Sequence, residues 1–184
     1  MTPYFFGYGS LVNRDTHDYG DCHPAQLHGW RRAWVRTELR DRVFLTVHMH
    51  GNSVIDGLVA AVPNADWGAL DLREYGYNRL SSGGAVKHPL KPAPDVEHYA
   101  IPPDAVGRQG DHVILLSYLD VVVQGFYREF GEEGVQRFFD TTDGWETPVF
   151  NDRDAPRYPR HRILKSEETE LVDHHLNQLS ALLK

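Results

Sequence analysis

The stretch that decides the fold stands near the start of the chain and reads Tyr4-Phe5-Phe6-Gly7-Tyr8-Gly9-Ser10-Leu11. Its aromatic part favours a β-strand, and Gly9-Ser10 breaks that strand before a segment of helical character. A glycine at the break lets a ligand approach the backbone, and successive N–H groups that lead into a helix can hold a carboxylate. The stretch therefore predicts a strand, a loop and a helix start, with Tyr8-Gly9-Ser10-Leu11 as a cradle for an acidic ligand. A tight turn with a serine cap is the alternative for these four residues.

The next part of the chain is rich in predicted strands. Residues 26–37 and 43–50 alternate β-forming and polar residues, and Asp41 with its neighbours predicts the turn of an antiparallel pair. Gly51-Asn52-Ser53 predicts a second turn before a third apolar run, residues 54–62. Gly57 lies inside that run, where it indicates a bulge or a close backbone approach.

A short helix is expected after Pro63, with Asn64 as its cap, Trp67, Leu70 and Glu74 on neighbouring turns and Gly76 at its end. Strands are expected at 77–82 and 97–101. The loop between them, residues 83–95, contains three prolines and is a candidate lid over a site.

The second half of the chain has helical periodicity. A helix is expected from Ser117, where Ser117 and Asp120 resemble a capping box, to a stop at Gly131. A shorter helix is expected over 134–140 and a terminal one from Ser166. Strands followed by helices in this order predict a single α+β domain over residues 1–184.

Composition narrows the classes of function. The 184 residues carry 19 Lys and Arg against 26 Asp and Glu, a net charge of −7 that argues against nucleic-acid or anionic-membrane partners. No apolar run approaches the length of a membrane helix, and Cys22, a single cysteine, cannot form an internal disulfide. A cytoplasmic protein with a small-molecule partner, as a monomer or a homodimer, is expected.

A second chemical feature lies around Glu74, in the stretch Leu70-Asp71-Leu72-Arg73-Glu74-Tyr75-Gly76-Tyr77-Asn78-Arg79. Aromatic neighbours remove water from a carboxylate and raise its pKa toward neutrality, which suits a general base. Glu74 is therefore the candidate acid/base residue. The alternative is that Glu74 only pairs with Arg73 or Arg79.

Together, the two features resemble the gamma-glutamylcyclotransferase-like superfamily, which includes the AIG2-like and ChaC-like proteins. In that family a Tyr-Gly-Ser loop after the first strand shares a pocket with a glutamate some sixty residues later, here Tyr8-Gly9-Ser10-Leu11 and Glu74. The resemblance covers about residues 4–130. It implies a small, twisted, barrel-like mixed β-sheet flanked by helices.

The resemblance also implies an activity. The α-amine of a γ-glutamyl substrate attacks its own γ-carbonyl, which releases 5-oxoproline and an amine or amino acid, as in the metabolism of glutathione. Such a cofactor-independent transferase or lyase would use Glu74 as general acid/base, and no metal is implied. Substrate-binding positions would be Tyr8, Gly9, Ser10 and Leu11, with Tyr77 beside Glu74 and, carried over from the family, Tyr99 and Tyr118.

Several alternatives stay open. The substrate can instead be a γ-glutamyl-amine or another acyl-amine of a specialised pathway, or the chain can be a non-catalytic module that binds a small carboxylate. From about residue 131 the chain departs from short family members, and within 141–160 Trp145, Arg153 and Arg157 either line the site or belong to a loop held by Asp–Arg pairs.

Histidines and the cysteine suggest weaker hypotheses. His48 with His50, and His174 with His175, are pairs that lack the further ligands of a zinc site. Cys22 next to His23 is discounted as a nucleophile. The Arg-rich stretches 31–42 and 157–162 are expected to be solvated faces or salt-bridge partners.

Overall fold

The computed structural model describes residues 2–37, 43–107 and 112–182. Its first strands are β1 (Tyr4–Gly7), β2 (His23–Val35) and β3 (Phe44–Ala61), with the single-turn helices η1 (Ser10–Val12) and η2 (Arg14–Thr16) after β1. There follow η3 (Pro63–Ala65), α1 (Gly68–Arg73), β4 (Asn78–Ser81), β5 (Val86–Lys87), β6 (Val96–Ala100) and η4 (Pro103–Ala105). The C-terminal part contains β7 (Ile114–Leu115), α2 (Leu116–Asp140), β8 (Thr142–Asp143), β9 (Val149–Phe150) and α3 (Ser166–Leu182).

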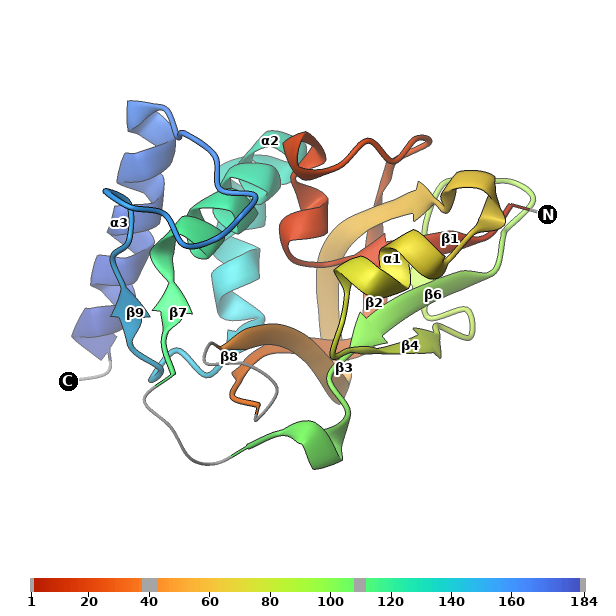
Figure 1. The fold of residues 1–184 in the computed structure, drawn as a ribbon, viewed down its shortest axis with the longest axis horizontal. Coiled ribbons are helices and arrows are strands. Elements are labelled where there is room, and N and C mark those ends of the chain that lie inside the picture. Colours follow the sequence, from red (N-terminus) through yellow and green to blue (C-terminus); the bar gives the residue numbers. More distant parts are fainter. Residues whose placement is uncertain (1, 38–42, 108–111, 183–184) are drawn as a thin grey trace.

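The main sheet is mixed and has the strand order β4-β6-β1-β3-β2-β5, with β8 paired to β2. β3 is antiparallel to both β1 and β2, whereas β1 pairs with β6, and β2 with β8, in parallel. The long strands β2 and β3 curl, so the sheet forms part of a barrel (Figure 1). This confirms the predicted α+β class with a barrel-like mixed sheet flanked by helices.

β3 differs from the prediction. Gly51-Asn52-Ser53 was expected to form a turn between two strands, and this is wrong because β3 runs through it. The pairing of β2 with β3 shifts register there, from His28 with Val54 to Trp30 with Met49, and Gly29 has a φ of 78°. The extra residues form a bulge that bends both strands, which is how this turn-prone stretch fits within a strand. The turn predicted at Asp41 lies outside the described residues.

The core lies on both faces of β1. Phe6 packs in the main hydrophobic cluster, which includes Phe126 of α2 and Val172 of α3. Phe5 faces the other side, in a smaller cluster with Leu70 of α1. Neighbouring residues of a strand point to opposite faces, so a strand covered on both sides reads as continuously apolar. Figure 1 shows α2 and α3 at one end of the molecule and α1 beside β1 and β6 at the other.

Gly57 allows β1 and β3 to approach closely, as predicted. A Cβ atom at Gly57 would lie 2.3 Å from the carbonyl oxygen of Gly7 and 2.5 Å from a ring carbon of Phe6. No real side chain tolerates such contacts. Glycine at this position therefore keeps the strand that precedes the predicted cradle in register.

The helix before Glu74 starts differently from the prediction. Asn64 does not cap it but lies inside η3 with a φ of 55°. The Oδ1 of Asp66 accepts a hydrogen bond from the N–H of Gly68 at the start of α1 (2.8 Å). Glu74 is the C-cap residue, and Gly76 follows with a φ of 97°, which agrees with the predicted end.

α2 also begins differently from the prediction but breaks where expected. Its backbone leaves the helical region at Gly131 (φ 67°, ψ −169°), which confirms the predicted stop and the shorter helix after it. The capping box of Ser117 with Asp120 is wrong. Instead, Asp152 accepts hydrogen bonds from both the N–H (2.8 Å) and the hydroxyl (2.6 Å) of Ser117. α3 starts at Ser166, as predicted.

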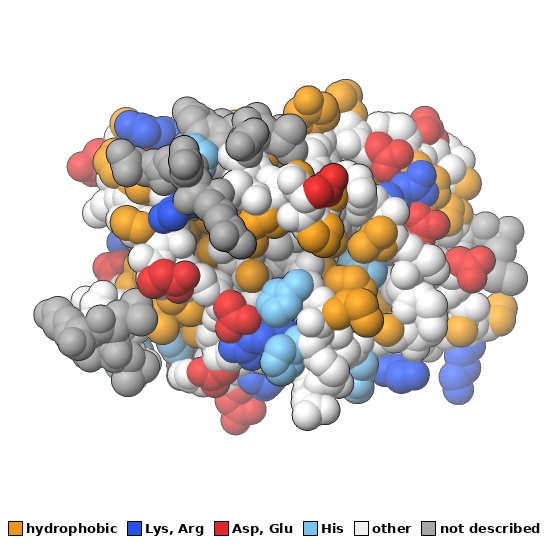
Figure 2. Space-filling model, turned by 90° about the horizontal axis from the view of Figure 1, so that it is seen from below, with side chains coloured by type: hydrophobic (Ala, Val, Ile, Leu, Met, Phe, Trp, Pro, Cys, Tyr) orange, Lys and Arg blue, Asp and Glu red, His pale blue; other side chains and the backbone are white. Residues whose placement is uncertain are grey.

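The surface of the described residues shows few features that bear on function. In the described part of the chain, each helix is too short or too polar to cross a membrane, and no three His, Cys, Asp or Glu side chains converge to suit a metal ion. On the face seen in Figure 2, His side chains lie near both acidic and basic ones. Ion pairs of this mixed kind join Asp143 to Arg31 (2.8 Å) and to His48 (3.3 Å).

Candidate active site

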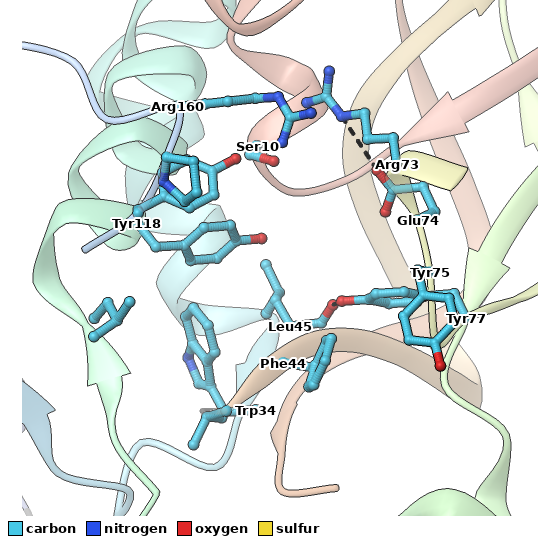
Figure 3. A pocket seen from close by; sticks show the side chains of 14 residues that line it. Ser10, Trp34, Phe44, Leu45, Arg73, Glu74, Tyr75, Tyr77, Tyr118 and Arg160 are labelled. Carbon is cyan, nitrogen blue, oxygen red and sulfur yellow. Dashed lines mark hydrogen bonds and ion pairs between the residues drawn. The ribbon is translucent and has the colours of Figure 1, made fainter. Parts of the chain in front are cut away.

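A cleft of about 210 Å³ opens between α1, the first turn of α2 and the curled end of β2 and β3 (Figure 3). Trp34, Phe44, Leu45 and Leu115 give it apolar walls. Its polar lining comes from Ser10, Arg73, Glu74, Tyr75, Tyr77, Tyr118, Tyr158 and Arg160.

A smaller recess of about 30 Å³ adjoins this cleft. Ser10, Leu45, Glu74, Tyr77 and Tyr118 border both cavities. All eight predicted site residues line the recess: Tyr8, Gly9, Ser10, Leu11, Glu74, Tyr77, Tyr99 and Tyr118. Two motifs some sixty residues apart in the sequence are therefore brought together around one small cavity.

Glu74 is placed by α1. The helix is fixed by buried Leu70, whose carbonyl oxygen accepts a hydrogen bond from the N–H of Glu74 (2.9 Å). The side chain of Glu74 is 18% exposed, and its Oε1 lies 3.4 Å from the Nε of Arg73. This is the ion pair that the alternative interpretation predicted. Arg79 instead pairs with Asp71 (3.1 Å) and Glu97 (2.8 Å).

Gly9 permits a tyrosine to approach the predicted cradle. A Cβ atom at Gly9 would lie 2.9 Å from the hydroxyl oxygen of Tyr118 and 3.2 Å from a methyl group of Leu45. Ser10 and Leu11, the first residues of η1, complete the loop. The first N–H groups of a helical turn have no partner inside it, and the backbone of Ser10 interacts with the hydroxyl of Tyr118.

Four tyrosines lie in or around the loop: Tyr8 and Tyr99 are buried, and Tyr77 and Tyr118 are partly buried. The hydroxyl of Tyr8 donates to the carbonyl oxygen of Tyr99 (2.7 Å), and that of Tyr99 donates to Asp71 (2.5 Å). The hydroxyl of Tyr77 donates to the carbonyl oxygen of Leu45 (2.8 Å). Burial, and then the charge of Glu74, raises the pKa of Tyr8. Burial also raises the pKa of Tyr118 and of Tyr99. All three stay neutral and able to donate at physiological pH.

Arg32 is the main residue that the sequence interpretation missed. It is fully buried, so the prediction of a solvated face or simple salt-bridge partner is wrong for it. Its guanidinium donates to the carbonyl oxygens of Tyr8 (2.9 Å) and Asp56, and burial lowers its pKa to about 9. Strand alternation is the signal that could have identified Arg32 as buried. Ala25 and Leu27 are buried before the bulge at Gly29, and Arg32 and Trp34 are buried after it.

The residues of segment 141–160 that line the cleft are not the ones that were predicted. Trp145 packs against Trp34 and Phe139 in the core, and Arg153 pairs with Asp120 (2.7 Å) and Asp173 (2.8 Å). The guanidinium of Arg157 lies over the ring of Phe150.

None of these three residues lines the cleft, so their predicted rim position is wrong and the loop held by Asp–Arg pairs is confirmed. Tyr158, Pro159 and Arg160 line the cleft instead. The predicted lid, residues 83–95, is paired to β2 through β5 and lines neither the cleft nor the recess. The thiol of Cys22 donates to a backbone carbonyl and does not contact His23, which pairs with Asp21.

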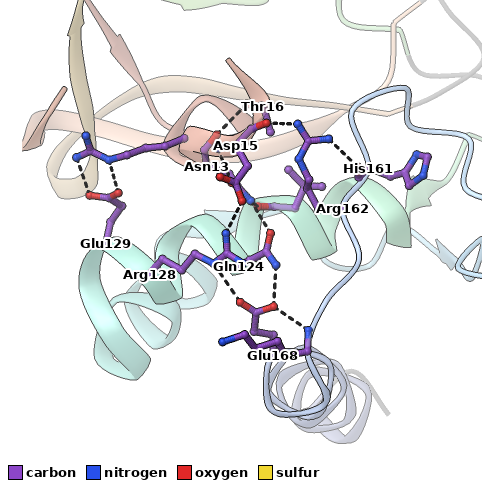
Figure 4. Close-up of polar contacts among 12 residues, drawn as sticks. Asn13, Asp15, Thr16, Gln124, Arg128, Glu129, His161, Arg162 and Glu168 are labelled. Carbon is purple, nitrogen blue, oxygen red and sulfur yellow. Dashed lines mark hydrogen bonds and ion pairs between the residues drawn. The ribbon is translucent and has the colours of Figure 1, made fainter. Parts of the chain in front are cut away.

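A network of polar contacts holds the loop that follows the cradle (Figure 4). The amide of Asn13 donates to the carbonyl oxygen of Val121 and to Gln124 of α2, both at 2.9 Å. Gln124 donates in turn to Glu168 of α3 (2.7 Å). Arg128 binds both Glu168 and Asp15. The backbone around the cradle is therefore fixed against two helices.

Comparison with known proteins gives a family match for the N-terminal part. Residues 3–79 match the model of ChaC-like proteins, a range that includes both the cradle motif and Glu74. No curated protein matches the sequence significantly.

Solved structures match more of the chain. A gamma-glutamyl cyclotransferase aligns with a TM-score of 0.53 and 13% identity over 93% of this chain and 98% of its own. The uncharacterized protein loc79017 from Homo sapiens aligns with a TM-score of 0.55 and 13% identity over 92% of this chain and 97% of its own. YkqA from Bacillus subtilis gives 0.54 and 16% over 78% of this chain, which spans only 56% of the YkqA chain.

At these identities the structural matches concern the fold, while the ChaC-like match concerns the sequence. Both are consistent with the resemblance to the gamma-glutamylcyclotransferase-like superfamily. The resemblance inferred from the motif pair is confirmed: this is a chain with the gamma-glutamylcyclotransferase-like fold and a ChaC-like N-terminal sequence.

Proposed function

We propose that this protein converts a γ-glutamyl compound into 5-oxoproline and a free amine or amino acid. The ChaC-like match over residues 3–79 and the gamma-glutamyl cyclotransferase fold support an activity of this type. The observation that carries the proposal is the recess itself, because Glu74 and the loop Tyr8–Leu11 border the same small cavity.

Glu74 acts as the base in this proposal. The α-amine of the substrate is an ammonium ion at neutral pH and has no lone pair for attack, so it must lose a proton. The carboxylate of Glu74, whose Oε1 lies 3.4 Å from the Nε of Arg73, accepts that proton. The amine nitrogen then bonds to the γ-carbonyl carbon, and the C–N bond to the leaving amine breaks as Glu74 returns the proton to the departing nitrogen. The ring nitrogen gives up its second proton, which the released amine takes up through solvent to become an ammonium ion. No electrons are exchanged with a cofactor in these steps.

The cradle stabilises charge in two places. As the amine attacks, the γ-carbonyl oxygen becomes an oxyanion, and backbone N–H groups placed beforehand stabilise it without cost of reorganisation. Gly9, Ser10 and Leu11 border the recess. In this proposal their backbone N–H groups bind either this oxyanion or the α-carboxylate of the substrate. The neutral hydroxyl of Tyr118, next to Gly9, is a further donor.

Shape contributes because the attack is intramolecular. The γ-glutamyl chain must fold back to bring its amine to the γ-carbonyl, and a site that holds this conformation removes much of the entropic barrier. The γ-carbonyl end of this half is proposed to lie at the recess, beside Glu74 and Tyr118, which border both cavities. The larger cleft that shares Glu74 and Tyr118 with it is the compartment for the leaving amine.

The test is a search for 5-oxoproline by mass spectrometry after incubation with glutathione, γ-glutamyl dipeptides and γ-glutamyl amines. We expect product from the wild type and its loss in Glu74→Gln, which keeps the shape of the side chain but cannot accept the proton. Glu132→Gln, an exposed glutamate of α2, is the matched control and should leave turnover unchanged.

Near wild-type turnover in Glu74→Gln would overturn the proposed mechanism. Product only from γ-glutamyl amines would identify the specialised acyl-amine enzyme. Binding of γ-glutamyl compounds with no product from any of them would identify the non-catalytic binding module.

A further inference from the structure

Two arginines meet at the edge of the cleft. Arg73 and Arg160 both line it, and Figure 3 shows their guanidinium groups turned toward one another above Ser10. Both also border a second depression beside Thr16 and His17, so they form the wall between the two hollows. Two like charges that face each other are unfavourable unless an anion lies between or beside them.

The positive charge of Arg73 is already matched. Its Nε lies 3.4 Å from Glu74, and its two terminal nitrogens donate to Thr16 at 3.1 and 3.2 Å. Its side chain is only 8% exposed. Arg73 is therefore a fixed part of the wall, and its charge is compensated by the base beside it.

Arg160 differs from Arg73 in having no such partner among the described residues. Among the residues that the structure describes, its side chain makes no hydrogen bond or ion pair, and it is exposed toward the cleft. Yet its backbone is held on both sides. The N–H of Tyr158 donates to the hydroxyl of Ser117 (3.2 Å), and the guanidinium of Arg162 donates to the carbonyl oxygen of Asp15 (Figure 4). The chain thus places a cation at the cleft and leaves its donors available.

The position of Arg160 indicates which half of a substrate it faces. It lines the outer cleft but not the recess, whereas Glu74 and Tyr118 border both. A substrate that presents its γ-carbonyl to the recess beside Glu74 would direct its leaving half into the outer cleft. That half would lie between Arg160 on one side and the apolar surface of Trp34 and Phe44 on the other.

We propose that Arg160 sets the specificity for the leaving amine by binding an anionic group on it, while Trp34 and Phe44 accept an apolar side chain. This rests on the proposed function. The substrate class is then a γ-glutamyl derivative of an apolar amine that carries an acid, with a carboxylate as the simplest case. An arginine suits this role because its planar guanidinium binds a carboxylate through two parallel hydrogen bonds.

A pair of substrates that differ only in the acid tests the proposal. γ-Glutamyl-phenylalanine and γ-glutamyl-phenethylamine share the γ-glutamyl group and the aromatic ring, and only the first has a carboxylate on its leaving half. We expect the wild type to prefer the first by about tenfold or more in kcat/KM, as a charged hydrogen bond at a cleft edge would produce. Arg160→Gln should lose this preference, and Arg160→Lys should keep part of it because the charge remains.

Arg157→Gln is the matched control. Arg157 stands three residues earlier in the same segment, lies over Phe150 and does not line the cleft, so its loss should leave the preference intact. Equal use of the two substrates by the wild type, or equal loss of both in Arg160→Gln, would overturn the role of Arg160.

Binding separates this inference from the proposed reaction. Titration calorimetry of both compounds with Glu74→Gln, and with Glu74→Gln combined with Arg160→Gln, measures recognition without turnover. Tighter binding of the carboxylate-bearing compound that depends on Arg160 supports the inference even if no 5-oxoproline forms. Equal binding of the two compounds, or binding of neither, contradicts it whether or not the reaction is found.

Discussion

The Nε of Arg32 donates a hydrogen bond of 2.9 Å to the carbonyl oxygen of Tyr8. Tyr8 directly follows β1 and Arg32 lies in β2, and β3 lies between these two strands in the sheet. Arg32 reaches across β3, where it also binds the carbonyl oxygen of Asp56, and its guanidinium lies over the rings of Phe126 and Phe138 at 4.8 and 5.2 Å. A buried arginine thus connects the cradle loop, the centre of the sheet and α2.

Replacement of Arg32 by lysine, another cation, should lower the free energy of unfolding. Arg32→Lys retains the charge but loses the planar set of donors, which leaves buried carbonyl oxygens unpaired. We expect the free energy of unfolding to fall by about 3 kcal/mol, measured by urea denaturation. Arg31→Lys is the control: the side chain of Arg31 is 22% exposed and pairs with Asp143, so its loss should cost less than about 1 kcal/mol. Equal effects of the two substitutions would contradict the role of Arg32.

Gly57 should not accept a side chain. In Gly57→Ala the new methyl group would meet the carbonyl oxygen of Gly7 and the ring of Phe6 at less than 3 Å, which forces β1 and β3 apart. We expect a loss of about 3 kcal/mol in unfolding free energy. Gly51→Ala in the same strand has no atom within 4 Å of its new methyl group and should change stability little. A Gly57→Ala variant as stable as Gly51→Ala would show that the strands can separate without strain.

Asp152 should stabilise the start of α2. Burial opposes its charge, but hydrogen bonds from Ser117 and from the N–H of Arg157 lower the pKa of Asp152 overall. Asp152→Ala leaves the first turn of α2 without its cap and should lower the free energy of unfolding by about 2 kcal/mol. Asp154→Ala, an exposed residue two positions later, is the control. A thermal melt in which both variants match the wild type would contradict the cap.

These cases show why some parts of the molecule were predictable. β1, the end of α1, the break in α2 and the start of α3 each have a local signal, such as an aromatic run or a glycine at a stop. Among the predicted site residues, Gly9 just after a strand and Glu74 at a helix end among aromatic residues carry local signals. Their combination in one site, together with Tyr99 and Tyr118, was predicted from the family resemblance. A pattern read over a few residues is enough for the local signals.

The remaining features depend on contacts between distant residues. Gly51-Asn52-Ser53 has turn composition, but pairing with β2 on both sides keeps it within β3. Asp120 has the right spacing to cap α2, yet the cap is Asp152, 35 residues from Ser117. Arg160 lines the cleft in a segment whose Arg162 binds the carbonyl oxygen of Asp15, 147 residues away. Tertiary contacts override local propensity in each case.

His98 should make the protein sensitive to acid. It is fully buried against Trp30 and bonded to Ser82 (3.0 Å), and burial lowers its pKa to about 4. In the unfolded chain a histidine has a pKa near 6.5, so between pH 6.5 and pH 4 the unfolded state binds a proton that the folded state does not. The contribution of neutral His98 to the free energy of unfolding is therefore complete above about pH 6.5. It is lost as the pH drops toward 4, by up to about 3 kcal/mol.

Urea denaturation at a series of pH values measures this loss. His98→Gln should flatten the curve in that range, since the amide does not titrate. His28→Gln, which removes an exposed histidine, should leave the slope of the wild type unchanged. The same slope in His98→Gln as in the wild type would assign the acid sensitivity to other groups.

The hydroxyl of Tyr118 should matter for turnover more than for folding. It lies against Gly9 in the wall shared by the recess and the cleft, and burial raises its pKa so that it stays a neutral donor. Tyr118→Phe keeps the ring contacts with Trp34 and Tyr158 but removes this donor. We expect kcat/KM for 5-oxoproline formation to fall by about tenfold or more, while the free energy of unfolding changes by no more than about 1 kcal/mol. Tyr127→Phe, on the same helix but outside both cavities, should keep full activity. Unchanged kcat/KM in Tyr118→Phe would remove this hydroxyl from the reaction and leave stabilisation of the oxyanion to the backbone N–H groups of the cradle.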